Sequence, residues 1–133
     1  MEQRFPPLTP SQRQLLQKGI LCFNREQFFE CHEVLEESWL EASGGQKRFL
    51  QGLIQVAAAF HHLRRGNQIG AGRLLTAGIE KLSAFAPRAA GLDITGLLET
   101  LEPLRKKILA GEVPPDWQAP QILWKPLPIS SAK

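Results

Sequence analysis

Signals that start and stop helices divide this chain into five segments, and they constrain its fold more than any other feature. The first is Thr9-Pro10-Ser11-Gln12, in which an N-cap threonine precedes a proline at the first helical position and a glutamine three residues after the cap. Four of the segments end at glycine or proline, which commonly close helices. The predicted helices cover residues 10–21, 25–42, 46–65, 68–85 and 94–110, and Asn24, Asn67 and Asp93 are the predicted N-caps of the second, fourth and fifth of them.

No stretch of the chain alternates apolar and polar residues with period two, so we predict no strands. The expected fold class is all-α, with about five helices in antiparallel hairpins. Such helices with short connections resemble a tetratricopeptide-like right-handed array, although the signature residues of that repeat are absent. Gly70, Gly72 and Gly78 in the fourth predicted helix indicate close approach of a neighbouring helix, since an interior glycine costs about 1 kcal/mol relative to alanine.

The C-terminal residues 112–133 break the helical pattern. Five prolines in this stretch forbid a long helix. Trp117, Ile122 and Trp124 make it too apolar for a solvated tail. We therefore predict a single domain over residues 1–133, with a helical body at about 9–111 and an extended arm at 112–133 that lies across the body.

Composition excludes several classes of protein. A chain of 133 residues with 22% charged residues is an ordinary globular domain. No apolar run approaches about 18 residues, so we expect no contact with a membrane, and the N-terminus lacks the apolar core of a secretory signal. Two cysteines, Cys22 and Cys31, fit a reducing compartment, so a cytoplasmic location is expected. A net charge of +3 without a recognition motif argues against nucleic acid as a partner, whereas a homo-oligomer stays open.

A histidine and a glutamate on the second predicted helix form the strongest candidate site. His32 and Glu36 are spaced i, i+4, and a helical wheel places both beside the apolar positions Phe28 and Trp39. We expect Trp39 to be deeply buried and Glu33 to lie on the shoulder of this face. His32-Glu33-x-x-Glu36 differs from the zinc motif His-Glu-x-x-His at its last position.

The third predicted helix supplies a second histidine. If the second and third helices form an antiparallel hairpin, His61 lies at the edge of the core within side-chain reach of His32, because the offset along the axis is about 5–8 Å. Gln55 then lies near the height of His32, whereas His62 falls on the polar side of the helix.

Three interpretations of His32, Glu36 and His61 compete. They can form a buried structural cluster, a metal site with three protein ligands, or a metal-free acid–base or ligand pocket. No cofactor is expected if the residues form a structural cluster or a metal-free pocket. A divalent metal is the alternative if they form a metal site. The candidate catalytic or metal-binding residues are His32, Glu36 and His61, and the candidate binding residues are Glu33, Trp39 and Gln55.

Two motifs resemble a known family. They are Phe23-Asn24 followed by His32-Glu33-x-x-Glu36-x-x-Trp39, and then Gln51-Gly52-Leu53-Ile54-Gln55. Together they resemble a family of small bacterial and archaeal helical proteins, domain of unknown function 309, over about residues 15–85. The resemblance implies tetratricopeptide-like hairpins and the label predicted metal-dependent hydrolase, without a reaction or a substrate. It maps onto the residues His32, Glu33, Glu36, Trp39, Gln55 and His61.

The function expected from the sequence is that of a small cytosolic helical protein with a His/Glu polar site between its second and third helices. One alternative is a metal-dependent hydrolase that uses His32, Glu36 and His61. The other is a protein-interaction module with a purely structural polar core. Whether the protein is an enzyme stays open.

Overall fold

Five helices and one short hairpin make up residues 7–124, the part of the chain that the computed structural model describes. The elements are α1 (Pro10–Asn24), α2 (Phe28–Leu40), α3 (Gly44–Arg64), α4 (Gln68–Ser83), β1 (Arg88–Ala89), β2 (Leu92–Asp93) and α5 (Ile94–Ala110). The prediction of an all-α fold with five helices is confirmed. None of the helices in residues 7–124 has the length and apolar character needed to cross a membrane.

The prediction that the chain has no strands is wrong for residues 88–93. There β1 and β2 pair antiparallel around Ala90 and Gly91, whose φ angles of 51° and 82° are both positive. Positive φ at both central residues is typical of the tight turns that join two strands. Each strand has only two residues, so the segment is too short to show a period-two pattern.

Side chains cap three of the helices as the sequence predicts. Thr9 and Gln12 form a reciprocal capping box at α1, and the side chains of Asn67 and Asp93 accept backbone N–H groups at the starts of α4 and α5. Gly111, with φ of 72°, ends α5 in the left-handed conformation that suits glycine.

The predicted cap of the second helix is wrong. Asn24 is the last residue of α1, which continues almost one turn beyond residue 21, and the N-cap of α2 is Gln27, which makes no capping hydrogen bond. The chain reverses between these helices at Glu26, where φ is 61°. The side chain of Asn24 is thereby free for another partner, described below.

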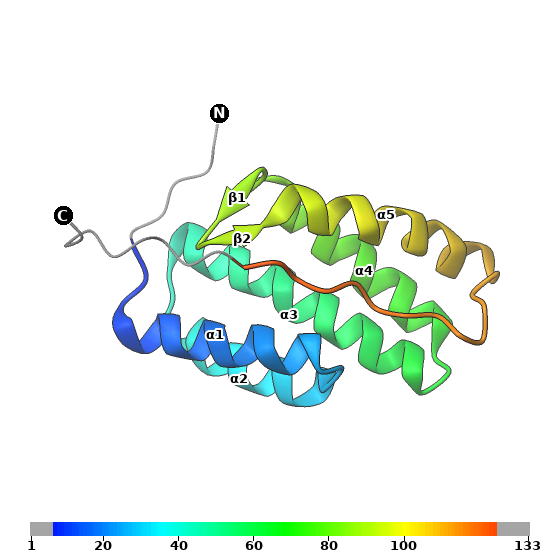
Figure 1. Cartoon of the computed structure of the whole chain (residues 1–133), viewed down its shortest axis with the longest axis horizontal. Helices are drawn as coiled ribbons and strands as arrows, with labels where there is room; N and C mark the ends of the chain where they lie inside the picture. The colour runs from blue at the N-terminus through cyan, green and yellow to red at the C-terminus, as the bar shows by residue number, and fades with distance from the viewer. Residues whose placement is uncertain (1–6, 125–133) are drawn as a thin grey trace.

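Consecutive helices run in opposite directions, and each packs against the next, with α3 between α2 and α4 (Figure 1). The antiparallel hairpins are therefore present, whereas the right-handed tetratricopeptide-like superhelix stays a prediction. The centre of the core contains Phe23, Phe28 and Phe60, whose ring centroids are 5.2–5.8 Å apart. These three rings join α1, α2 and α3.

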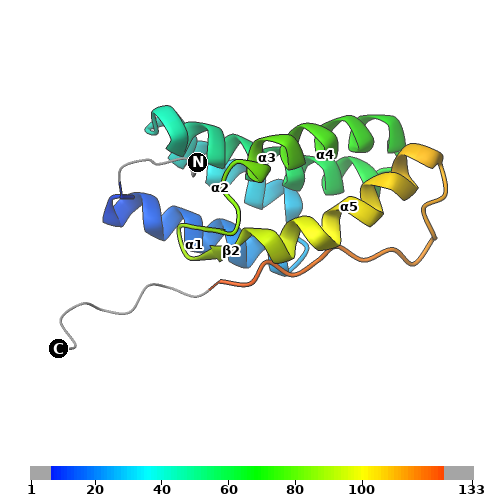
Figure 2. The same cartoon turned by 90° about the horizontal axis from the view of Figure 1, so that it is seen from above.

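The arm lies across the helical body as predicted, as far as residue 124. It leaves the end of α5 and returns along the face between α1 and α5 (Figures 1 and 2). Trp117 stacks on Phe60 with ring centroids 5.7 Å apart, and Ile122 is only 4% exposed. Trp124 is half-buried and forms a bridge with Leu92 of β2. The remainder of the predicted arm, 125–133, lies outside the described residues.

Replacing Trp117 with alanine is expected to lower the free energy of unfolding by about 1–2 kcal/mol, less than for a fully buried aromatic ring because Trp117 is half-buried. Urea denaturation followed by circular dichroism measures the change. Leu123→Ala is the matched control, because Leu123 belongs to the same arm but is 64% exposed. Equal stability of Trp117→Ala and the wild type would show that the stacking on Phe60 contributes nothing.

Candidate functional site

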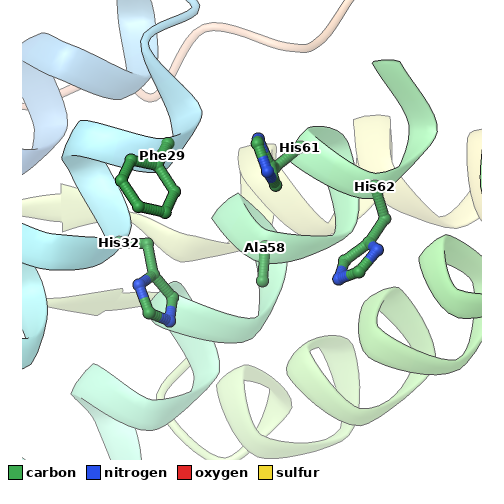
Figure 3. Close-up of a pocket in the computed structure, with 5 residues that line it drawn as sticks. All are labelled: Phe29, His32, Ala58, His61 and His62. Carbon is green, nitrogen blue, oxygen red and sulfur yellow. The ribbon is translucent and has the colours of Figure 1, made fainter. Parts of the chain in front are cut away.

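A small pocket lined by three histidines lies between α2 and α3. It has a volume of about 200 Å³. Figure 3 shows that His32 and His62 lie on either side of Ala58, while His61 and Phe29 lie next to each other. The small side chain of Ala58 leaves the space that the imidazoles surround. The antiparallel α2–α3 hairpin produces this arrangement, because it brings the beginning of α2 beside the end of α3.

His61 is the imidazole of this pocket with the fewest polar restraints. The centre of its ring lies 5.5 Å from that of Phe29, and the ring nitrogens make no hydrogen bond to the residues that the structure describes. Burial lowers the pKa of His61 below its ordinary value, and the positive charges of Arg65 and its neighbours lower it further. The neutral ring of His61 is therefore available to accept a proton or a hydrogen bond at neutral pH.

Asn67 determines the tautomer of His62. The Oδ1 atom of Asn67 accepts the N–H of Gly70 at 2.9 Å, so its Nδ2 points to Nδ1 of His62, 3.1 Å away. An amide nitrogen can only donate, so Nδ1 of His62 accepts and the ring proton sits on Nε2. The N-cap of α4 thus selects the Nε2–H tautomer of the His62 ring.

His32 and Glu36 are close but do not form a hydrogen bond. The Nε2 atom of His32 lies 3.9 Å from Oε2 of Glu36, which is an ion-pair distance when the ring is protonated and too long for a hydrogen bond. The side chain of His32 is 33% exposed and that of Glu36 is 54% exposed. The expectation that the pair lies on a buried face is therefore wrong.

The orientation of α2 explains this difference. The residues that α2 buries are Phe28, Cys31, Val34, Leu35 and Ser38. These buried residues face α1 and α3. The helical wheel drawn from the sequence instead predicts a buried face centred on Trp39. The true buried face is rotated toward Ser38, which leaves Glu36 in solvent.

The other predicted binding residues lie outside the pocket. Glu33 and Glu36 line a separate open hollow with Lys18 and Cys22 of α1. Trp39 is half-buried rather than deeply buried, and Nζ of Lys47 lies 4.2 Å from the centre of its ring.

Gln55 is half-buried on α3, and its Oε1 atom is buried without a hydrogen-bond partner among the described residues. It is absent from the lining of the histidine pocket. A binding role for Gln55 therefore stays a prediction.

The residues do not fit a metal site with three protein ligands. Within residues 7–124 there is no group of three or more His, Cys, Asp or Glu residues placed to hold a metal ion. Glu36 points to the hollow on the α1 side, and Nδ1 of His62 is already occupied by Asn67. Burial, with a smaller effect of Cys22, raises the pKa of Cys31 to about 12, so its thiol stays protonated and is a poor ligand.

Three residues of the pocket, Phe29, Ala58 and His62, were not predicted from the sequence. His62 was placed on the polar side of α3, and Phe29 was not considered. The signal that could have identified His62 is its i, i+4 spacing from Ala58, which puts the two residues on one face of α3.

The pKa of His61 is expected to be below 6.5 in the folded protein, for the reasons given above. Because the unfolded chain then binds the proton more tightly, this residue contributes stability above about pH 6.5 that is lost as the pH falls toward the folded pKa. A titration of the imidazole signals by NMR measures the pKa directly. His61→Gln should make stability less dependent on pH in this window, and a folded pKa at or above 6.5 would contradict the expectation.

Together, the fold and the pocket define an all-α protein of antiparallel helical hairpins with a small histidine-lined pocket between two of them. Residues 16–74 match the family described as Domain of unknown function (DUF309), which confirms the resemblance over that range. The matched range contains every residue that lines the histidine pocket.

A relative from Bacillus subtilis (strain 168), the uncharacterized protein YpuF, is 43% identical to this chain over 84 residues. The alignment covers 61% of this chain and 48% of the relative. The chain therefore spans about half the length of the curated relative that it matches.

Proposed function

We propose that the protein binds a small planar anion, such as an aromatic carboxylate, in the histidine pocket between α2 and α3. The observation that carries the proposal is the convergence of three imidazoles from two helices on one open pocket. An imidazole ring that becomes protonated attracts a carboxylate, and the ring of Phe29 offers a flat apolar surface beside His61. A volume of about 200 Å³ limits the ligand to a molecule smaller than typical drug-sized ligands.

The half-exposed positions of the histidines support binding over a purely structural role. His32, His61 and His62 are all partly accessible, and a polar cluster that only holds helices in register would be sealed from solvent. The hydrolase alternative receives less support, because its ligand set, His32, Glu36 and His61, is not brought together around one point. We therefore propose that the pocket binds a ligand without hydrolysing one. In this proposal His61 accepts the proton that attracts the carboxylate, and His32 is a second contact of the ligand.

The test uses benzoate as the probe and benzyl alcohol as its uncharged counterpart. Benzoate should shift the NMR signals of the His32 and His61 rings in a saturable manner, and more strongly at pH 5.5 than at pH 7.5, because protonated imidazoles bind the anion. Benzyl alcohol should cause much smaller shifts.

Ala58→Leu should abolish the benzoate shifts by filling the pocket, whereas Ala110→Leu should not, because it makes the same enlargement at an exposed position on α5. Benzoate shifts that persist in Ala58→Leu, or that are absent from the wild type at both pH values, would refute the proposal.

A further inference from the structure

Asn24, which the sequence suggested as a helix cap, binds the backbone of the C-terminal arm. Its Nδ2 atom donates to the carbonyl oxygen of Ile122 at 3.0 Å, and its Oδ1 atom accepts the N–H of Ile122 at 2.7 Å. A residue in a neighbouring antiparallel strand would make the same two bonds. The Asn24 amide therefore recognises an extended backbone without contacting the side chain of the residue that it holds.

The hairpin continues this backbone recognition along the arm. The N–H of Asp93 donates to the carbonyl oxygen of Leu123 at 3.0 Å, and Leu92 forms an antiparallel bridge with Trp124. The arm thus adds to the edge of β2 in the way that peptide ligands bind by strand addition. The Asn24 side chain of α1 and the backbone of β2 both bind the backbone of the arm, and together they define one groove.

Trp117 and Ile122 are the main apolar anchors of the arm, Val113, Ala119 and Trp124 pack partly against the core, and two hollows flank the arm between these contacts. Trp117 stacks on Phe60, and Ile122 is buried five residues further along. A hollow of about 370 Å³ lies between α5 and the arm residues Gln118–Pro120, and another of about 360 Å³ lies beside Leu123 and Trp124. The arm is therefore held by separate apolar and backbone contacts with hollows between them.

We propose that the groove between α1 and α5 is a docking groove for an extended segment, and that the arm of a second copy of this chain occupies it in an arm-exchanged dimer. The contacts of Asn24 with Gln121 and Ile122 join residues 97 and 98 positions apart, so the arm of a partner can make them equally well. No contact of the arm with the body is lost on exchange.

Only the hinge at residues 111–116 has to change its path. It contains Gly111 and the pair Pro114-Pro115. The N–H groups of Gly111 and Glu112 donate to carbonyl oxygens in the last turn of α5, and beyond them the described backbone bond of the hinge joins the N–H of Trp117 to the carbonyl oxygen of Pro114. The arm of the same chain has a high effective concentration at its own groove, so dilute protein stays monomeric and dimers form as the concentration rises.

Two full-length variants with complementary defects test the proposal. Asn24→Leu has a weakened groove and an intact arm, whereas the double variant Trp117→Ala/Ile122→Ala has an intact groove and a weakened arm. When they are mixed at high concentration, native mass spectrometry should show more heterodimer than homodimer of either variant. The vacant groove of the second variant then receives the free arm of the first.

The control is the triple variant Asn24→Leu/Trp117→Ala/Ile122→Ala mixed with the double variant, which should form no heterodimer because neither chain has an intact arm. Gln17→Ala, an exposed change on α1, should behave as the wild type.

A second measurement keeps the proposal testable if the double variant does not fold. Deleting Pro114 and Pro115 shortens the hinge and hinders the return of the arm to its own body, so this variant should shift from monomer to dimer at lower concentration than the wild type. Folded variants that stay monomeric in the mixture, or a shortened hinge that gives no additional dimer, would overturn the proposal and leave the arm as a purely intramolecular segment.

Discussion

Replacing Phe60 with alanine is expected to lower the free energy of unfolding by about 3–5 kcal/mol, as is typical for truncation of a fully buried aromatic ring. Phe60 is completely buried and contacts Phe23 of α1, Phe28 of α2 and Trp117 of the arm. The alanine variant leaves a cavity where these elements meet, and rigid neighbours cannot close it. Chemical denaturation followed by circular dichroism measures the loss.

Phe29→Ala is the control for this experiment. Phe29 is also an aromatic residue of the α2–α3 interface, but it is 51% exposed at the rim of the histidine pocket. We expect its replacement to change stability by less than about 1 kcal/mol. Similar losses for the two variants would show that the core is not centred on Phe60.

Replacing Gly78 with alanine is expected to lower the free energy of unfolding by about 2–3 kcal/mol through overpacking. A Cβ atom at this position would lie 2.9 Å from the carbonyl oxygen of Gly52 and 2.8 Å from Cγ2 of Val56. The oxygen belongs to the backbone of α3, so it cannot move aside without moving the helix. This steric cost exceeds the gain of about 1 kcal/mol that alanine brings to an open helical position.

Thermal and urea denaturation of Gly78→Ala should both show the loss, whereas Arg73→Ala on the exposed face of α4 should stay within about 0.5 kcal/mol of the wild type. A stabilised Gly78→Ala variant would mean that α3 and α4 are further apart than the structure shows.

The three glycines of α4 were predicted to mark a close approach of helices. Gly78 meets α3 and Gly72 meets Leu109 of α5, whereas Gly70 instead lies against the side chain of Asn67.

Features decided by local chemistry could be predicted from the sequence. Thr9, Asn67 and Asp93 cap helices because a side-chain oxygen and a backbone N–H three residues later meet in any chain with that local geometry. Gly111 ends α5 for a similarly local reason. The positions of all five helices follow from such signals, with errors of a few residues at their ends.

Features that depend on distant parts of the chain could not be predicted in the same way. Asn24 has the residue type of a cap, but its partner Ile122 lies 98 positions away. The burial expected for His32 and Glu36 was wrong for the same reason. A helical wheel gives the relative directions of Glu36 and Trp39, but the contacts of α2 with α1 and α3 decide which direction is buried.

One part of the site prediction used the antiparallel hairpin to compare positions along the helix axes. His32 and His61 were expected at similar heights on antiparallel helices, and both line the pocket. The helical wheel puts His62 on the polar side of α3, yet its ring lines the same pocket as Ala58 and His32 (Figure 3).

The return of the arm from α5 to α1 changes the connectivity of the whole molecule. Each helix packs chiefly against its neighbours in sequence, so without the arm α1 and α5 would be the two ends of a linear stack, and each end could open by itself. Because Asn24 and Phe60 hold the segment that follows α5, the last helix is tied to the first three. The stack thereby becomes a closed ring of contacts, in which unfolding of one end requires the release of the other.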